Sequence, residues 1–593
     1  MSPHLPPVAP AVTAELVEAL SPRLRKRLDA GIAKLADNPA TVDGTTVRIA
    51  IDDTTHVELH APDGTVTTAD DIRCGCLLAP SCLHRAAAAS AAPVADVTGE
   101  SATDEPAPDS SSDASRVTTT PDSPPPPPDA RQPTNASEPA PTATTEQRAA
   151  ARSLLTAAGA VLEAGTDGSG AVLQAELLRA AHTAGLAGLP RAASSAVSAV
   201  TALRAARASA PTYRLADLAT ALGDVLTVAH RAPHAEGAEL TELRGTARQP
   251  YRPDGSLRLY GVFSEPVLTA SGYAGAVTWT ADAGGRLYQV SDVAPGGAGR
   301  AVGAADRAVR IGDTALTHRE LSRAGLAVSG ATVSPTGRLG AGARVRAVRA
   351  SGADWRAEPL DRLWAVPVCE QVSRALTGGP DLLFLDVVLT STVREAAGDC
   401  LLADCGGVDL RLRAAHDHPA LPHRENLRLL AAAQGSRLRI VARLTPAPHP
   451  RATLLAIEHP TIPGTRVDVG LDHLRRADLP TTRTSPPLPA PLPDEPPLHL
   501  LRRRVHQAVS GGRRALSFPA DTTSDTRRLN RHGLSTAGDI LGELHAAATE
   551  RSRDVFGRLL PTDADRFTRA WLTAARYTDE LDRALCAAAW APA

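Results

Sequence analysis

Aromatic residues and lysine are scarce in this chain of 593 residues. Phe, Trp and Tyr together make up 3% of the sequence, and its two lysines are Lys26 and Lys34. Nearly all of the basic charge is therefore arginine, a bias typical of a GC-rich genome, so a single arginine says little about function. Surfaces that hold single-stranded nucleic acid usually stack its bases on aromatic rings, and this composition leaves few rings for such a surface.

Long apolar runs are missing as well. No uninterrupted run reaches the roughly 18 residues of a membrane-spanning helix, and prolines interrupt the start of the chain, where a secretory signal needs apolar residues. The net charge is -2, so overall basicity does not point to a nucleic-acid partner. The seven cysteines are an odd number spread over a long chain, unlike a disulfide framework. We expect a cytoplasmic protein with reduced thiols and no membrane partner.

The chain is too long for one hydrophobic core, and its sequence pattern changes several times. We predict a multidomain α+β protein with six segments: a small ββα domain with an N-terminal helix at 1–96, a disordered Pro/Ser/Thr-rich linker at 97–147, a helical bundle at 148–250, a β-rich region at 251–478, a Pro-rich linker at 479–497 and a C-terminal helical region at 498–593.

The first segment carries clear local patterns. Apolar residues at helical spacing predict a helix over Val12–Ala36, and strand-like runs follow at Val47–Ile51 and His56–His60. A third strand is predicted at Thr65–Thr68. The Ala-rich stretch His84–Ala92 suits a helix.

The β-rich region contains a weak internal repeat. Each copy has three strands, a short helix and two more strands, and the triplets His318-Arg319-Glu320 and His423-Arg424-Glu425 occupy matching helix starts. This order is expected of an OB-like small barrel. We therefore predict two tandem OB-like barrels, with an unspecified β-rich domain as the alternative. The helix-start position favours capping and packing over acid–base chemistry for both triplets.

Six aromatic residues gather in the first copy of this repeat. They could stack bases in a single-stranded nucleic-acid site, or they could form a hydrophobic core; the sequence leaves both readings open. The residues are Tyr251, Tyr260, Phe263, Tyr273, Trp279 and Tyr288.

The stretch CGCLLAPSCLHRAA places four metal-binding side chains close together. Cys74, Cys76, Cys82 and His84 follow the pattern C-x-C-x5-C-x-H. A tight turn lets the first two thiolates face one ion, and the loop Leu77–Ser81 returns the chain so that the other two ligands complete a tetrahedron. Three thiolates and one imidazole are a common closed ligand set for Zn2+, with no position left for water. We predict a structural Zn2+ site.

Charge and compartment support this interpretation. Three thiolates on Zn2+ leave a net charge of about -1, and Arg73 and Arg85 flank the motif as electrostatic partners. The alternatives are a chance cluster of reduced cysteines or a disulfide. A disulfide would leave one of the three thiols unpaired and does not suit the expected compartment.

The same stretch resembles the SWIM zinc finger, whose pattern is C-x-C, a variable spacer and C-x-H within a strand-strand-helix arrangement. The resemblance covers about residues 40 to 95, and the five-residue spacer is slightly shorter than usual. The whole architecture is similar to actinobacterial SWIM-finger proteins. The resemblance implies binding to DNA or to proteins, and bacterial relatives suggest a MoxR-type ATPase or a von Willebrand A-type protein as partner.

Other candidate sites are weaker. His416, His418 and His423 have loose spacing and are interpreted as a surface loop. Cys400 and Cys405 are interpreted as half-buried thiols at a turn, whereas Cys369 and Cys586 are interpreted as core residues. The Gly-rich stretch at 295–303 lacks the Lys-Ser/Thr ending of a phosphate-binding P-loop and is interpreted as a loop.

The C-terminal helical region is the most basic stretch of the chain. We interpret its arginines as a solvated helix face. They are Arg502, Arg503, Arg504, Arg513, Arg514, Arg527, Arg528 and Arg531.

No catalytic motif is recognised, so we predict a non-enzymatic, zinc-stabilised protein that binds a protein or DNA partner. The alternative is an accessory factor that binds single-stranded nucleic acid through OB-like repeats. An enzyme with an unrecognised site is the third hypothesis.

Overall fold

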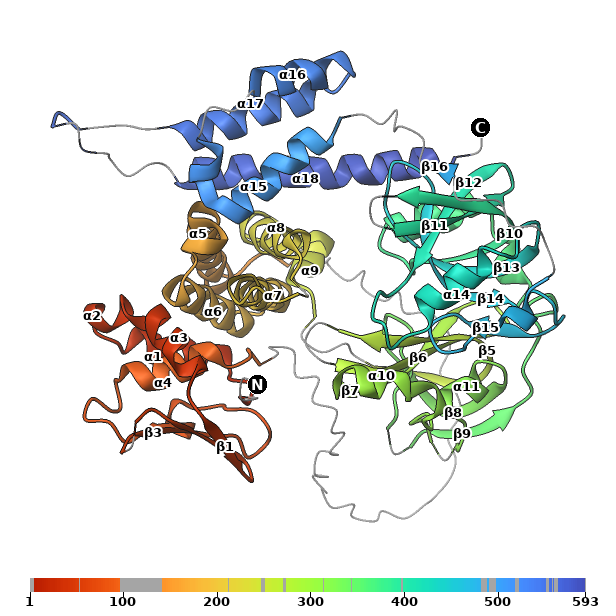
Figure 1. The fold of residues 1–593 in the computed structure, drawn as a ribbon, viewed down its shortest axis with the longest axis horizontal. Helices are drawn as coiled ribbons and strands as arrows, with labels where there is room; N and C mark the ends of the chain where they lie inside the picture. The colour runs from red at the N-terminus through yellow and green to blue at the C-terminus, as the bar shows by residue number, and fades with distance from the viewer. Residues whose placement is uncertain are drawn as a thin grey trace, which may run out of the picture. The chain divides into compact units, whose positions relative to one another are not determined.

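A computed structural model gives the fold, drawn as a ribbon in Figure 1. The chain divides into two compact units. The first comprises Met1–Val161, Ser169–Arg204 and Thr220–Ala247, and the second comprises Leu162–Gly168, Ala205–Ala219 and Arg248–Ala593. The residues described are 5–52, 54–95, 141–211, 213–246, 251–269, 273–312, 314–342, 344–395, 398–480, 488–489, 497–517, 522–550, 554–556, 558 and 564–591. Most of the two predicted linkers, at 97–147 and 479–497, lies outside these residues.

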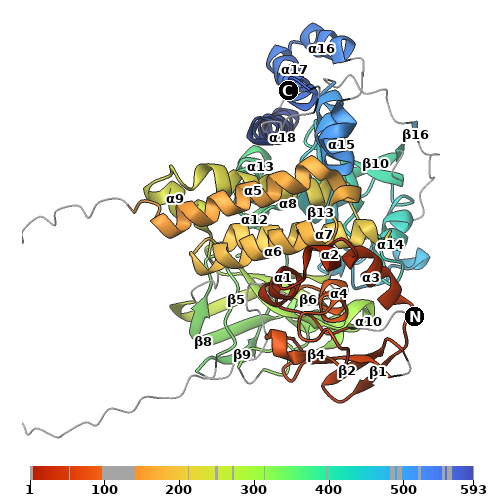
Figure 2. The ribbon, with the colours of Figure 1, turned by 90° about the vertical axis from the view of Figure 1, so that its left-hand side faces the viewer.

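A four-stranded antiparallel sheet with helices on one face forms the N-terminal part of the first unit (Figure 2). Val47, Ile49, Val57 and Leu59 are buried and alternate with more exposed residues, and the last three belong to the core that packs against the helices. The strands are β1 (Ala40–Asp43), β2 (Thr46–Ala50), β3 (His56–His60) and β4 (Ile72–Cys74). The helices are α1 (Pro10–Glu18), α2 (Pro22–Arg25), α3 (Leu28–Ala36) and α4 (Leu83–Ala91).

The single helix predicted at Val12–Ala36 is wrong, because three helices occupy these residues. The Ser21 side chain caps the backbone N–H of Leu24, and Pro22 begins the second helix. Proline suits the first turn of a helix but interrupts the interior of one.

The third strand is also displaced from the predicted Thr65–Thr68. Thr68 and Asp71 form a reciprocal capping box around a short 3-10 turn, and the strand follows as β4. This shift positions the site, because β4 ends at Cys74.

Five helices confirm the predicted helical region that follows. Leu154, Leu177 and Leu203 are fully buried, and many alanines between them allow the helices to approach closely. The helices are α5 (Thr145–Gly168), α6 (Ala171–Leu186), α7 (Pro190–Arg207), α8 (Leu215–Arg231) and α9 (Gly237–Arg244).

The first part of the β-rich region is a five-stranded antiparallel sheet in the order β7-β6-β5-β8-β9. This sheet, the first barrel, stays open, because its end strands β7 and β9 do not pair among the described residues. Short helices separate its third and fourth strands in sequence, which confirms the predicted order of elements. The strands are β5 (Arg252–Leu268), β6 (Tyr273–Ala281), β7 (Leu287–Pro295), β8 (Gly325–Val333) and β9 (Arg346–Ala350), and the helices are α10 (Gly297–Val302) and α11 (His318–Leu321).

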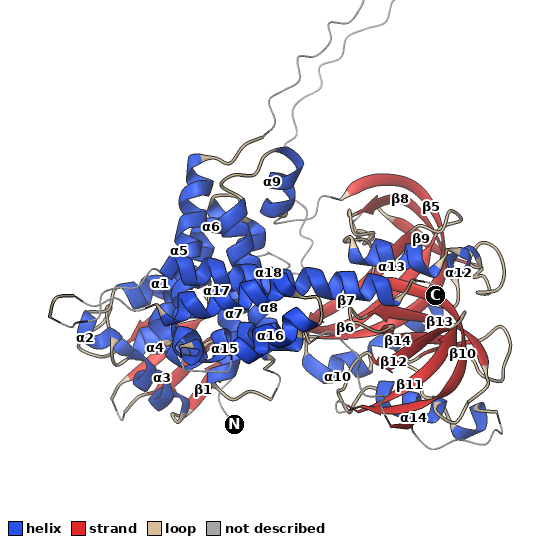
Figure 3. Cartoon of the chain, turned by 90° about the horizontal axis from the view of Figure 1, so that it is seen from above, coloured by secondary structure: helices blue, strands red, loops and turns tan. Residues whose placement is uncertain are grey.

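The second part repeats this order and closes into a barrel (Figure 3). Strand β10 pairs with both β11 and β13, while β12 pairs in parallel with β14, so five strands form a continuous ring. Helix α14 (His423–Leu430) lies in sequence between the third and fourth of them. The strands are β10 (Leu382–Glu395), β11 (Gly398–Cys405), β12 (Val408–Ala414), β13 (Arg437–Leu444) and β14 (Arg451–Glu458); β15 (Arg466–Asp468) and β16 (Leu488–Pro489) add to the sheet.

An aromatic core is shared by the two sheets. Trp355 and Trp364, from the segment that connects them, lie with ring centroids 4.8 Å apart, and Phe384 of β10 meets Trp364 edge-on at 5.1 Å. The indole N–H of Trp355 donates to Val262 O at 3.0 Å, whereas that of Trp364 donates to Ile440 O at 3.3 Å. Each tryptophan therefore anchors a different sheet.

The C-terminal region is helical, as predicted, but its arginines are not a uniformly solvated face. Arg504 is buried and pairs with Asp525 at 3.0 Å, and Arg513 is buried and donates to Glu163 at 2.9 Å. Within the described residues, no helix has the length and apolar character needed to cross a membrane. The helices of this region are α15 (His499–Leu516), α16 (Thr522–Arg531), α17 (Ser535–Thr549) and α18 (Ala564–Ala589); α12 (Arg362–Ala365) and α13 (Val368–Leu376) lie in sequence between β9 and β10.

The two histidines at the matching helix starts are buried. His318 Nδ1 lies 2.7 Å from Thr278 Oγ1, which lies 2.7 Å from Ser264 Oγ, and the Ser264 hydroxyl donates to the His318 carbonyl. Since the serine proton is used there, the threonine proton goes to the serine oxygen and His318 donates from Nδ1. Burial lowers the pKa of His318 to about 4, against an opposing effect of Asp292. Burial, with His416, lowers the pKa of His423 to about 4, against an opposing effect of Asp417.

These histidines make the barrels sensitive to acid. Because their pKa falls from 6.5 to about 4 on folding, the unfolded chain binds more protons in that window. The resulting stability is complete above pH 6.5 and is lost as the pH falls towards 4. We expect a His423→Gln variant to lose less melting temperature between about pH 7 and pH 5 than the native protein, as measured by thermal unfolding.

Replacing the exposed His473 in the same barrel by Gln is the matched control and should leave the pH effect unchanged. Burial raises the pKa of Asp468 to about 6, so this carboxyl makes the folded protein more stable as the pH falls, opposite to the histidines and over an overlapping pH range. The comparison of the pH effect in the two variants therefore isolates the contribution of His423. The same pH effect in His423→Gln and in the native protein would contradict the assignment.

Candidate metal centre

The end of β4 and the start of α4 bring the four predicted ligands together. Their ligand atoms, one each from Cys74, Cys76, Cys82 and His84, all lie within 4.8 Å of one another, and Cys74 Sγ is 3.7 Å from His84 Nδ1. Ligands about 2.3 Å from a common tetrahedral ion lie roughly 3.8 Å apart. The chain therefore gathers the side chains at the separation that one ion needs.

Backbone contacts fix this arrangement. Cys74 pairs with Val57 of β3, and the next backbone N–H, that of Gly75, donates to His56 O at 3.3 Å. The Ala79 N–H donates to Cys76 O at 3.1 Å and closes a turn of the loop. Cys82 is the extended residue before α4 and is buried, while the other three ligands are partly buried.

Arg85 holds the loop from the inside. Its guanidinium is buried and donates to the carbonyl oxygens of Ile72, Pro80 and Ala69, so one side chain joins β4, the loop and the preceding turn. Arg73 donates to Asp70 O at 3.2 Å. That both arginines are electrostatic partners of the thiolates stays a prediction; the hydrogen bonds give Arg85 a further role, because they join three backbone segments.

The thiols differ in how readily they ionise. Burial raises the pKa of Cys74 to about 12, with the neighbouring thiols Cys82 and Cys76 adding to the effect against a hydrogen bond from the Cys76 backbone. Burial also raises the pKa of Cys82. At Cys76 burial alone would raise the pKa, but hydrogen bonds from the Leu78 N–H and from the neighbouring thiols outweigh burial, so the pKa is lowered. A divalent cation would displace the remaining protons, because thiolate is the form that binds metal.

The donor set determines the chemistry that this site supports. Three sulfur ligands and an imidazole favour a soft or borderline ion such as Zn2+ over Mg2+ or Ca2+, which prefer oxygen. Four protein ligands fill a tetrahedron, so such a site holds the chain in shape and offers no open position for a substrate. Among the described residues, no other group of His, Cys and acidic side chains is arranged to hold an ion.

Several secondary predictions need correction. Cys400 and Cys405 lie in strand β11 and are buried, so they are not half-buried thiols at a turn. Cys405 packs in the barrel core with Leu401 and Ala403, whereas Cys400 is on the other face of the strand. Cys369 is exposed in α13, whereas Cys586 is buried as predicted. His423 opens α14 and is buried, so it is not part of a surface loop with His416 and His418.

Two further predictions have opposite outcomes. Part of the Gly-rich stretch forms helix α10, where Arg300 pairs with Asp292 at 2.8 Å, instead of an open loop. Thr317 and Glu320 form a capping box and His318 is buried, which bears out capping and packing for the first triplet.

The aromatic cluster lies mainly in the protein interior. Phe263, Trp279 and Tyr288 are buried, and the first two belong to the core that joins the two sheets. Tyr251 is exposed. Three of the six rings are thus buried, and Tyr260 and Tyr273 are half-buried, which favours the core reading over base stacking.

Comparisons with known proteins add little. No family model matches the sequence, and no curated protein matches it. Among solved structures, the chain is similar to "Crystal structure of Ifi202 HINa domain in complex with 20bp dsDNA", with 8% sequence identity and a TM-score of 0.19. That match covers 35% of this chain and 93% of the other. A similarity of this size carries no argument about this protein.

The contacts of Arg85 give a direct test of the centre. In an Arg85→Ala variant three carbonyls lose their donor, so we expect the affinity for Zn2+ to fall roughly 10- to 100-fold, as measured by competition with a chromophoric chelator. Arg73→Ala is the control, because Arg73 is exposed and makes one backbone contact. Equal affinities in the two variants would show that Arg85 does not support the site.

Proposed function

We propose that the N-terminal part of this protein is a structural zinc module. The single observation that carries the proposal is the convergence of three thiols and one imidazole within 4.8 Å. Zinc is the common occupant of closed Cys3His sites, and its binding contributes on the order of 10 kcal/mol to the folding of small modules. The core of this part is built mainly of short aliphatic residues and alanine, so a bound ion would add rigidity where packing is light.

We further propose that the module is of the SWIM type. Support comes from the arrangement of a sheet, a C-x-C turn, a short loop and a helix that begins with C-x-H. The five-residue spacer is short for this type, yet the ligand atoms still meet, because the Cys76–Ala79 turn reverses the chain at once.

The module is the part of a non-enzymatic protein that binds another protein. Leu77 is fully exposed and Leu78 is mostly exposed at the tip of the loop, and residues 75–82 contain no basic side chain. Phosphate backbones are bound by Arg and Lys, whereas exposed apolar residues held rigidly are typical of protein contacts. The loop therefore suits a protein better than DNA, and a MoxR-type ATPase or a von Willebrand A-type protein is the partner class that follows from the SWIM resemblance.

Metal content tests the zinc proposal. We expect about one Zn2+ per chain in the native protein and none in a Cys82→Ala/His84→Ala variant, as measured by elemental analysis after gel filtration. Loss of the ion should also make the N-terminal part more sensitive to proteolysis, because the loop and α4 lose their common anchor.

Cys369→Ala is the matched control, since Cys369 is exposed and lies outside the cluster. This variant should keep its zinc. A native protein without zinc, or a double variant that retains it, would reject the proposal.

A further inference from the structure

An open cavity of about 580 Å3 lies in the first barrel, and none of its lining residues belongs to the metal centre. Its lining includes Arg319 and Arg323, at and just after α11, and Arg349 on the edge strand β9. Glu320 and Ser351 complete its polar groups. No aromatic residue lines it, so the cavity has the chemistry for an anion and lacks a surface for stacking a base.

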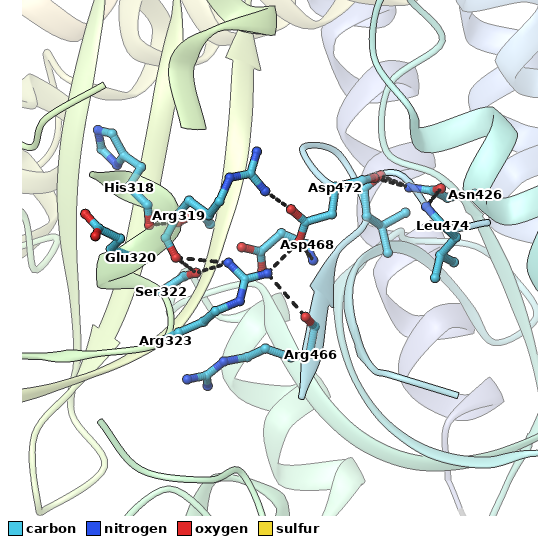
Figure 4. A network of polar contacts seen from close by, with 12 residues as sticks. His318, Arg319, Glu320, Ser322, Arg323, Asn426, Arg466, Asp468, Asp472 and Leu474 are labelled. Atoms are coloured by element: carbon cyan, nitrogen blue, oxygen red, sulfur yellow. Dashed lines mark hydrogen bonds and ion pairs between the residues drawn. The ribbon is translucent and has the colours of Figure 1, made fainter. Parts of the chain in front are cut away.

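Two of the three arginines are held in fixed positions (Figure 4). Arg319 pairs with Asp306 at 2.8 Å and also with Asp472, while Arg323 donates to Asp472 at 2.7 Å and to the Arg319 carbonyl at 2.9 Å. A guanidinium has five N–H groups. Arg323 also donates to Arg466 O at 3.3 Å and to Ser322 Oγ at 3.5 Å, so most of its N–H groups are used, whereas the contacts of Arg319 with its two carboxylates use two. The side chains are therefore ordered before any ligand arrives, which lowers the entropic cost of binding.

Asp472 is itself positioned by the second barrel. The Asp468 backbone N–H donates to its carboxylate at 2.9 Å, and Asn426 donates to the Asp472 carbonyl and accepts from the Leu474 N–H at 2.9 Å. Asn426 is fully buried in α14. The carboxylate thus neutralises one arginine of the pair and holds both in place.

Arg349 differs from these two arginines. Its side chain is 65% exposed, and its pairing with Glu320 is loose, at 3.8 Å. Three guanidinium groups face three carboxylates, those of Asp306, Glu320 and Asp472, so the charges balance and the loose pairing of Arg349 is what leaves a guanidinium available to a ligand. Of the three arginines, Arg349 has the longest ion pair and a mostly exposed side chain, so an incoming ligand can reach it from solvent.

We propose that this cavity binds the phosphate groups of a polyphosphate or phosphodiester ligand. Guanidinium forks match phosphate oxygens bidentately, and the volume is that of a small-molecule site rather than of a single carboxylate. The phosphates are supplied either by a free nucleotide or by a nucleic-acid strand; both present the same chemistry to the arginines. The site involves no metal ligand, so it is independent of the zinc module.

Binding of two probes by the full chain tests this site. The probes are a fluorescein-labelled oligothymidylate, followed by fluorescence anisotropy, and inorganic triphosphate as its competitor. We expect Arg349→Glu to weaken oligothymidylate binding about tenfold or more and to reduce the dependence of log K on log salt by about one.

Arg310→Glu is the matched control. Arg310 lies in the same barrel, is 72% exposed and has an equally loose pairing, 3.8 Å from Asp292, but does not line the cavity. This variant should bind within about twofold of the native protein. Competition by triphosphate identifies a free polyphosphate as a sufficient ligand, whereas binding of the oligonucleotide alone identifies the strand; either supports the site.

Three outcomes would overturn the proposal: no binding of either probe, equal weakening by Arg349→Glu and Arg310→Glu, or displacement by a polyglutamate peptide as effective as that by triphosphate. The second would indicate diffuse charge, and the third a site for carboxylates. None of them bears on the zinc content of the protein, so the two proposals fail separately.

Discussion

The contact between Trp355 and Trp364 is the constraint on which the arrangement of the two barrels depends. Each indole N–H is bonded to a different sheet, and the rings meet at 4.8 Å. Arg443 of β13 adds a bidentate pair with Glu265 of β5, at 2.8 and 2.9 Å. A chain with so few aromatic residues thus concentrates them where two domains must share a core, and burial there gives large rings their greatest stabilising effect.

This constraint also explains how a site within one barrel depends on the other. Asp472 comes from the second barrel, yet it orders Arg319 and Arg323 of the first. A rigid joint is required for such a contact to persist, since a carboxylate that drifted by a few ångströms would leave both guanidinium groups to solvent. The aromatic core therefore holds the two barrels together by packing, and the polar network fixes the orientation of the two arginines.

Local patterns in the sequence were sufficient to predict the convergence of four metal-binding side chains and the order of strands. The C-x-C and C-x-H pairs lie within eleven residues, so their convergence needed only a turn and a helix start. The repeat of three strands, a helix and two strands was visible for the same reason. The third strand lies at β4 because Thr68 and Asp71 form a capping box, which competes with strand pairing. The residues Thr65–Thr68 are typical of a strand, so the sequence alone did not indicate this cap.

The cavity lined by arginines could not be predicted from the sequence. Arg349 and Arg319 are thirty residues apart, Asp472 belongs to another barrel, and an arginine-rich composition hides any single functional arginine. The roles of Arg85 and Arg513 were missed for the same reason, because burial and partners depend on the folded chain. Charge runs show where arginines occur and not which of them the fold encloses.

The two barrels differ in one respect that affects behaviour at high protein concentration. The second closes its ring through the parallel pair of β12 and β14, whereas β9 of the first has a strand partner, β8, on one side only among the described residues. An open strand edge invites pairing with another copy and, in the end, aggregation. Arg346 and Arg349 are exposed on β9, so pairing of β9 with β9 of another copy would bring like charges together. The arginines of the strand proposed to bind phosphate therefore also oppose this pairing.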